Sequence, residues 1–194
     1  HKIYGEAAAI LAGDGLLTWA FDLLSAAEKT SIRAEKRLEI IQIIARAAGS
    51  LGMVGGQALD IEHENKSFPF DMLKTIHRNK TGALITASVL AGATGAGGSK
   101  EQLVSLKEYG DQIGLAFQIV DDLLDVTSTT EELGKAAGSD EALGKATYPA
   151  FFGIDETRKK AIEAVDKAVS SLDGFDHKAE PLRQLAQYIY SRTH

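Results

Sequence analysis

Four polar side chains recur at helical spacing in an otherwise apolar stretch, residues 114–126, which reads GLAFQIVDDLLDV. They are Gln118, Asp121, Asp122 and Asp125, and a helix would align them in one narrow stripe. The other residues are apolar apart from one glycine, which is typical of a buried helix. The pattern predicts that the polar stripe faces an interior cavity, although a solvated acidic turn on a helix surface has the same spacing.

Carboxylates gathered in an interior are costly unless a cation accompanies them. Asp121 and Asp125 would lie about 6 Å apart, where two negative charges repel by about 3 kcal/mol at an effective dielectric constant of about 20. The stretch contains no Lys or Arg that would offset this repulsion. Because Mg²⁺ binds one or two carboxylates together with substrate phosphates, the stripe is a candidate magnesium site.

Two segments on the N-terminal side of this stretch also have unusual composition. Glycines at positions 49, 52, 55 and 56 interrupt a helical pattern, which indicates close helix packing or a backbone near a ligand. Lys80, Thr81 and Gly82 interrupt an apolar helix, as a binding motif or a simple helix kink would. His77, in the basic patch before them, is predicted to lie at the surface.

The segment after residue 126 is polar and rich in Gly, Ser and Glu. Within it Leu-Gly-Lys-Ala occurs at 133–136 and again at 143–146, which places Lys135 and Lys145 next to glycine hinges. A lysine that closes over a bound diphosphate would neutralise its charge and exclude water. A solvated loop is the alternative.

Motifs along nearly the whole chain resemble those of the trans-prenyltransferases, the polyprenyl diphosphate synthase family. The similar segments are YGEAAAILAGDGLL, GGQALD, KTG, FQIVDDLLD and GKATYP. KTG and GKATYP are features of the enzymes that elongate isoprenoid chains. The resemblance implies condensation of isopentenyl diphosphate with an allylic diphosphate, giving farnesyl or geranylgeranyl diphosphate and pyrophosphate.

The same resemblance implies roles for individual residues. Lys80 would bind the allylic diphosphate together with Lys135 and Lys145, and Thr81 and Gln118 would face the carbocation. Asp121 is the best single Mg²⁺ ligand, Asp125 would act directly or through water, and Asp122 would serve the outer shell. Gln57 and Asp60 would lie near the metal–diphosphate site, or on a helix surface without a role.

The expected fold is all-α, an antiparallel helical bundle of the isoprenoid synthase type around a central cavity. Residues 1–194 are predicted to form a single domain, the C-terminal two-thirds of a polyprenyl synthase domain. The helix over residues 4–26 would pack in the core and at the interface of a homodimer. The family's first aspartate-rich motif has no counterpart in these residues, so this part alone should be inactive.

Composition narrows the possible partners and the possible location of the protein. The net charge of −6 argues against a nucleic-acid partner, and the absence of cysteine fits a cytoplasmic protein. No apolar run is expected to approach the length of a membrane span. Two other functions remain open: a non-catalytic helical subunit of a prenyl synthase, and a terpene cyclase-like enzyme on the same fold.

Overall fold

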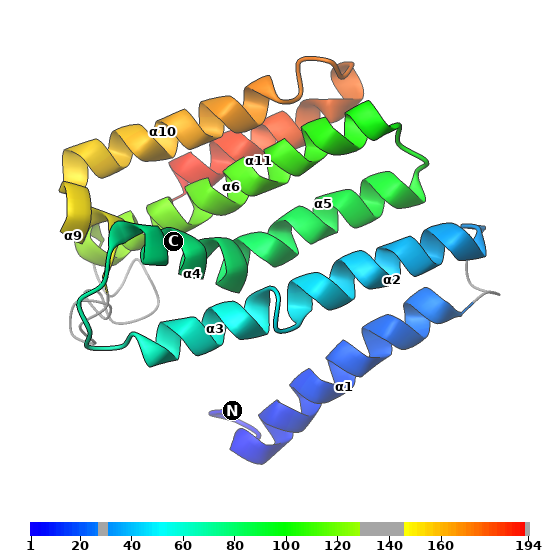
Figure 1. Ribbon diagram of the computed structural model, residues 1–194, viewed down its shortest axis with the longest axis horizontal. Coiled ribbons are helices and arrows are strands. Elements are labelled where there is room, and N and C mark those ends of the chain that lie inside the picture. Colours follow the sequence, from blue (N-terminus) through cyan, green and yellow to red (C-terminus); the bar gives the residue numbers. More distant parts are fainter. Residues whose placement is uncertain (27–30, 129–145, 193–194) are drawn as a thin grey trace.

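The computed structural model describes residues 1–26, 31–128 and 146–192, which form helices and no strand (Figure 1). The all-α prediction is therefore confirmed. The N-terminal half contains α1 (Glu6–Ser25), α2 (Ala34–Ala48), α3 (Met53–Glu62), α4 (Phe70–His77), the π-helix η2 (Arg78–Gly82) and α5 (Ala83–Gly95). The remainder contains α6 (Lys100–Thr127), α9 (Tyr148–Phe152), α10 (Ile154–Ser170), the 3₁₀ turn η3 (His177–Ala179) and α11 (Glu180–Ser191).

Helix α6 is the central element of the bundle and carries the aspartate stretch. It begins with a capping box, in which the Ser99 side chain accepts from the Gln102 backbone N–H and the Gln102 side chain accepts from the Ser99 backbone N–H. Successive long helices run antiparallel, and α6 packs against α5 on one side and α10 on the other (Figure 1). The stretch is thus held in the interior, as its apolar composition predicts.

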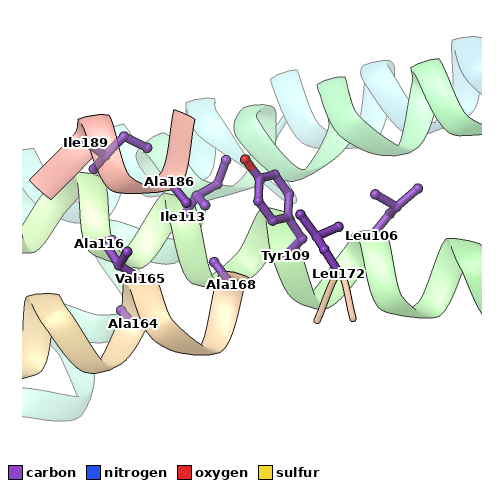
Figure 2. Close-up of a cluster of buried hydrophobic side chains, with 10 residues drawn as sticks. All are labelled: Leu106, Tyr109, Ile113, Ala116, Ala164, Val165, Ala168, Leu172, Ala186 and Ile189. Atoms are coloured by element: carbon purple, nitrogen blue, oxygen red, sulfur yellow. The ribbon is translucent and has the colours of Figure 1, made fainter. Parts of the chain in front are cut away.

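The main core lies between α6, α10 and α11 and consists largely of aliphatic residues and alanine (Figure 2). Tyr109 is its one aromatic member and is fully buried. Its hydroxyl donates a hydrogen bond of 2.7 Å to the carbonyl oxygen of Leu182, and burial raises the pKa of Tyr109 to about 12. The polar end of the ring is thereby satisfied inside the core.

On the other side of α6, a cavity of about 790 Å³ lies between α2, α4, η2, α5 and α6. Its walls are apolar at Ile43, Leu51, Leu90 and Leu115, and charged at Arg46, Lys74, Arg78, Lys107, Asp71 and Asp111. The expected cavity between the helices is present in this part of the fold.

Helix α1 differs from the expectation that it packs in the core. It buries none of its residues and lies beside α2 at the edge of the bundle (Figure 1). Leu11, Leu16 and Trp19 are each more than half exposed. Because α2 covers only a narrow part of α1, its apolar residues face outward.

Two helical segments, Glu6–Ser25 and Ala34–Glu62, are long and apolar enough to cross a membrane. This finding corrects the expectation that no apolar run approaches the length of a membrane span. The criterion alone is weak evidence for a span, because the core helix of a soluble protein also meets it.

The stretch from Tyr148 onward is divided into two helices, α9 and α10. Gly153 lies between them with φ of 75°, a conformation that costs glycine little and other residues more. The Thr147 side chain caps the start of α9 by accepting from the Ala150 backbone N–H. The break directs the chain from the end of α6 back along the bundle.

Candidate functional site

Lys80 and Thr81 lie on the π-helix η2, a local widening between α4 and α5. Such π-turns occur frequently at functional sites because they redirect side chains out of the regular helical register. A Cβ added at Gly56 of α3 would lie 2.2 Å from the backbone nitrogen of Lys80. The glycine therefore allows α3 to contact the π-turn directly, which confirms the prediction of close helix packing at this position.

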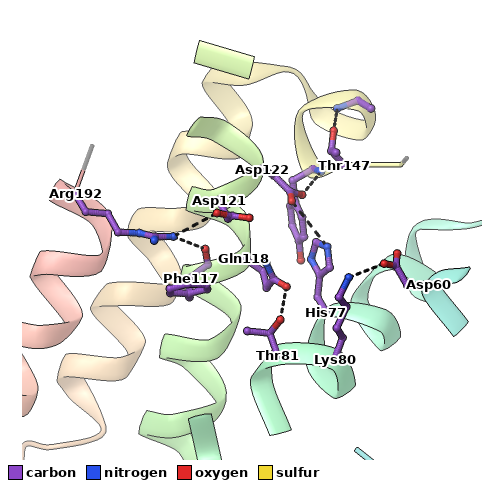
Figure 3. A network of polar contacts seen from close by, with 12 residues as sticks. Asp60, His77, Lys80, Thr81, Phe117, Gln118, Asp121, Asp122, Thr147 and Arg192 are labelled. Atoms are coloured by element: carbon purple, nitrogen blue, oxygen red, sulfur yellow. Dashed lines mark hydrogen bonds and ion pairs between the residues drawn. The ribbon is translucent and has the colours of Figure 1, made fainter. Parts of the chain in front are cut away.

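Thr81 and Gln118 come together from elements 37 residues apart. The Thr81 hydroxyl donates a hydrogen bond of 2.7 Å to Oε1 of Gln118 (Figure 3). A Cβ at Gly114 would lie 2.9 Å from Cα of Gly82, so glycines on both elements let α6 approach η2. The hydrogen bond holds the Thr81 hydroxyl and the Gln118 amide next to each other. This closeness is required if both are to face the carbocation.

Lys80 is paired with Asp60, another of the predicted site residues. Its Nζ donates to Oδ2 of Asp60 at 2.6 Å, and the Lys80 and Asp60 side chains are 32 % and 19 % exposed. The pair orients the lysine while leaving part of its ammonium group accessible. Gln57, one turn earlier on α3, is half-buried and is not among the residues that line the nearby pocket, so its role stays a prediction.

The three aspartates of α6 have different surroundings. Asp121 is the accessible one, with a side chain 36 % exposed. Asp122 is buried and accepts a 2.8 Å hydrogen bond from the backbone N–H of Tyr148. Asp125 is 1 % exposed. Tertiary packing thus leaves Asp121 partly exposed and buries the other three members of the predicted polar stripe.

These residues surround a pocket of about 160 Å³. Gln118, Asp121 and Asp122 line it from α6, and Asp60, His77 and Lys80 line it from α3, α4 and η2; Asp125 is not part of its wall. His63, Glu64, Phe68, Leu73, Ile76, Ala146 and Thr147 complete the lining. The pocket therefore presents one lysine and several carboxylates to a single small volume.

The carboxylates at the pocket fit Mg²⁺ only when other oxygen ligands complete its coordination. Among the described residues, no group of three or more His, Cys, Asp or Glu side chains is arranged to hold a metal by itself. Magnesium commonly keeps its waters and binds through one or two carboxylates plus substrate phosphates. Asp121 is suited to that arrangement because it is exposed at the pocket, whereas Asp122 and Asp125 are buried.

Three residues at the site were not identified from the sequence. His77 was expected at the surface, but it is buried and stacks on the ring of Tyr148, with centroids 5.7 Å apart. Burial, and then the charge of Asp122, raise the pKa of Tyr148 to about 12. The adjacency of His77 to the Lys80 turn was the one available signal.

Arg192 is the third, and it comes from the end of the described chain. Its Nη2 donates to the carbonyl oxygen of Phe117 at 3.2 Å and lies 4.0 Å from Oδ1 of Asp121 (Figure 3). Its guanidinium lies over the Phe117 ring, 4.1 Å from the centroid. Nothing in the local sequence distinguishes this arginine. Lys135 and Lys145, by contrast, lie outside the described residues.

Known proteins resemble this chain along nearly its whole length. A family model described as Polyprenyl synthetase matches residues 1–185. Farnesyl diphosphate synthase of Escherichia coli (strain K12) is 47 % identical, and the alignment covers all of this chain and 66 % of that protein. This chain thus spans slightly less than two thirds of the relative's length.

Two solved structures have the same fold. Geranylgeranyl pyrophosphate synthetase from Pyrococcus horikoshii Ot3 matches with a TM-score of 0.84 and 30 % identity, over 99 % of this chain and 69 % of that one. Geranyltransferase from Helicobacter pylori, complexed with magnesium and isoprenyl diphosphate, matches with a TM-score of 0.80 and 33 % identity, over 98 % of this chain and 61 % of that one.

Proposed function

The chain belongs to the polyprenyl synthetase family, and we propose that the protein containing it is a short-chain trans-prenyltransferase. It would condense isopentenyl diphosphate with an allylic diphosphate to give farnesyl or geranylgeranyl diphosphate plus pyrophosphate. The observation that supports the proposal most directly is that Lys80, Gln118 and Asp121 line one pocket, while Thr81 donates a hydrogen bond to Gln118. Each of these residue types meets a separate demand of that reaction.

The first demand is charge on the leaving diphosphate. As the bond from the allylic carbon to oxygen breaks, negative charge develops on the diphosphate, and donors placed in advance stabilise it. Lys80 would donate to a diphosphate oxygen, with Asp60 holding the ammonium in place at 2.6 Å. Lys135 and Lys145 are proposed to bind the same group.

The second demand is a cation without a competing nucleophile beside it. Thr81 donates its hydroxyl hydrogen to Gln118, so lone pairs on both oxygens remain available to face positive charge at the allylic carbon. The double bond of isopentenyl diphosphate would attack that carbon, and loss of a proton would complete the condensation. A fixed pair of dipoles stabilises the cation without reorganising during the reaction.

We propose Mg²⁺ as the cofactor, held through Asp121, with Asp125 acting directly or through water and Asp122 in the outer shell. Gln57 would support this region from α3. When bound with a diphosphate, magnesium supplies positive charge that makes pyrophosphate a better leaving group. The magnesium and isoprenyl diphosphate in the Helicobacter pylori geranyltransferase complex support magnesium as the cofactor by similarity.

We further propose that the protein is a homodimer in which α1 lies at the interface. The support is the row of exposed apolar side chains on α1, among them Ile10, Leu11 and Leu16, since patches of this kind mark interaction surfaces. A cytoplasmic location is also proposed, and the cysteine-free composition fits it.

Product analysis tests the proposed reaction. The complete protein would be incubated with isopentenyl diphosphate, Mg²⁺ and each allylic diphosphate in turn, and the chain length of the product would be determined by mass spectrometry. We expect a product of fifteen or twenty carbons. No elongated product, from material whose intact mass shows the complete chain, would contradict the proposal and favour a non-catalytic subunit.

A further inference from the structure

Three segments of the chain meet at the wall of the pocket, and Figure 3 shows His77 of one segment facing Asp122 of another. His77 ends α4, Asp122 lies in α6, and Tyr148 begins α9, and we call these three residues the junction. Each is at most 9 % exposed. The junction therefore connects elements separated by 26 to 71 positions in the chain.

The two carboxylate oxygens of Asp122 face different partners. Oδ2 accepts the Tyr148 backbone N–H at 2.8 Å, while Oδ1 lies 3.9 Å from Nε2 of His77. The rings of His77 and Tyr148 stack within 19° of parallel. A buried carboxylate needs such partners, because removing one leaves charge uncompensated in the interior. The three residues thus support one another pairwise.

His77 and Asp122 of the junction line the pocket themselves, and all three members adjoin segments that carry other site residues. His77 directly precedes η2, which carries Lys80 and Thr81; Asp122 follows Asp121; and Tyr148 follows Thr147. A displacement of the junction would therefore change the distance between the lysine on η2 and the carboxylate on α6. Displacements of about 1 Å suffice to weaken a preorganised site severely.

We propose that His77 is a positioning residue, which acts through Asp122 and Tyr148 to hold the Lys80 turn against α6 in the arrangement that binds a diphosphate. The proposal rests on the diphosphate site of the proposed function. His77 need not touch the ligand in this role. Its Nε2 edge faces Oδ1 of Asp122 at 3.9 Å, and its ring face stacks on Tyr148 at the start of α9.

The test separates these two contributions by measuring the affinity of the complete protein for pyrophosphate in Mg²⁺ by calorimetry. His77→Phe keeps an aromatic ring against Tyr148 and removes the polar edge, whereas His77→Gln keeps an amide that faces Asp122. We expect His77→Phe to weaken pyrophosphate binding about tenfold, which is within the range of interaction energies between residues in contact. We expect His77→Gln to weaken it by less than about threefold. His177→Phe, at an exposed histidine of η3, is the matched control and should bind normally.

A double-mutant cycle distinguishes positioning from general damage to the fold. In an Asp122→Asn background, His77→Phe should cost less than about twofold, because the partner it acts through is already altered. Urea unfolding of each variant checks that the fold persists. Unchanged binding by His77→Phe, equal losses for the Phe and Gln variants, or fully multiplicative losses with Asp122→Asn would each overturn the proposal.

The result for the junction can be distinguished from the result for the proposed prenyltransferase reaction. Coupled losses of pyrophosphate binding, in a protein that makes no prenyl product, would support the junction and contradict the synthase. Product formation with a His77→Phe variant that binds normally would do the reverse. A wild-type protein that binds no pyrophosphate in Mg²⁺ would overturn both.

Discussion

At the scale of single residues, identical side chains in one motif have different functions available to them because their surroundings differ. Asp121 is partly exposed at the pocket, and Asp125 is buried. Asp122 accepts a hydrogen bond from the Tyr148 backbone N–H and faces His77. Exposure decides which carboxylate exchanges water for a metal or a phosphate, because a buried carboxylate would first lose the partners that compensate its charge.

Asp121→Ala should therefore lower turnover by at least about 100-fold, since it removes the accessible metal ligand. The free energy of unfolding should change by less than about 0.5 kcal/mol, because the substitution also removes repulsion from neighbouring carboxylates. Steady-state kinetics of the complete protein and urea unfolding measure the two effects. Asp166→Ala, at an exposed aspartate of α10, is the control, and full turnover by Asp121→Ala would refute the metal assignment.

At the scale of helices, the site depends on elements that approach more closely than most side chains permit. Gly56 contacts the backbone of Lys80, Gly110 contacts Thr86, and Gly114 contacts Gly82. These contacts bring α3, η2 and α6 together without intervening side chains. The helices consequently set the separation between Lys80 and the α6 carboxylates.

Gly56→Ala tests this close approach. Its Cβ would meet the Lys80 backbone nitrogen at 2.2 Å, so the π-turn must shift, and we expect a loss of about 1–3 kcal/mol of stability with weaker binding of pyrophosphate in Mg²⁺. Gly92→Ala in α5 is the matched control, because nothing lies within 4 Å of its added Cβ. That control should gain about 0.5–1 kcal/mol from helix propensity. Equal behaviour of the two variants in unfolding and calorimetry would refute the argument.

The packing of α6 against α11 predicts a dependence on alkaline pH. The pKa of Tyr109 is raised from 10.0 to about 12 in the folded protein, so the unfolded chain loses its phenolic proton first. The stability that Tyr109 contributes is therefore complete below pH 10 and is lost as the pH rises toward 12.

Tyr109→Phe should flatten this decline, and at neutral pH it should cost about 1 kcal/mol through the lost hydrogen bond to Leu182. Urea unfolding between pH 8 and about 11.5 measures both effects. Tyr148 is expected to add to the same decline, since its pKa is also raised to about 12. Tyr188→Phe, at an exposed position of α11, is the control, and an unchanged slope for Tyr109→Phe would contradict the prediction.

At the scale of the whole molecule, α1 is apolar yet buries none of its residues. Within the described structure it meets mainly α2. The exposed surface of Ile10, Leu11, Leu16 and Trp19 is therefore available for an interface with a second copy, which the homodimer proposal requires.

Leu11→Glu should weaken that association, because it places a charge in an apolar interface. Sedimentation equilibrium of the complete protein should show a dimer for the wild type and at least about a tenfold higher dissociation constant for the variant. Ile162→Glu, at an exposed apolar position of α10, should leave the dimer intact. Unfolding of Leu11→Glu without prior dissociation would instead place α1 inside its own subunit.

The sequence by itself determined that the described chain is helical and that it carries the motifs of its family. The helical periodicity, the interruption at Lys80–Gly82 and the closeness of Thr81 to Gln118 were predictable. These features depend on neighbouring residues or on motifs shared with the family. Only the tertiary structure decided that Asp60 holds Lys80, that His77 is buried against Tyr148, and that Asp125 is separated from the pocket.

The physical reason is that these contacts join residues from different helices. The spacing of residues along one helix does not specify which other helix packs against it. Arg192 reaches Phe117 across 75 positions, and no pattern within its own segment specifies that contact. Helix packing decides which side chains of a motif stay exposed. Here it leaves Asp121 accessible and buries Asp125.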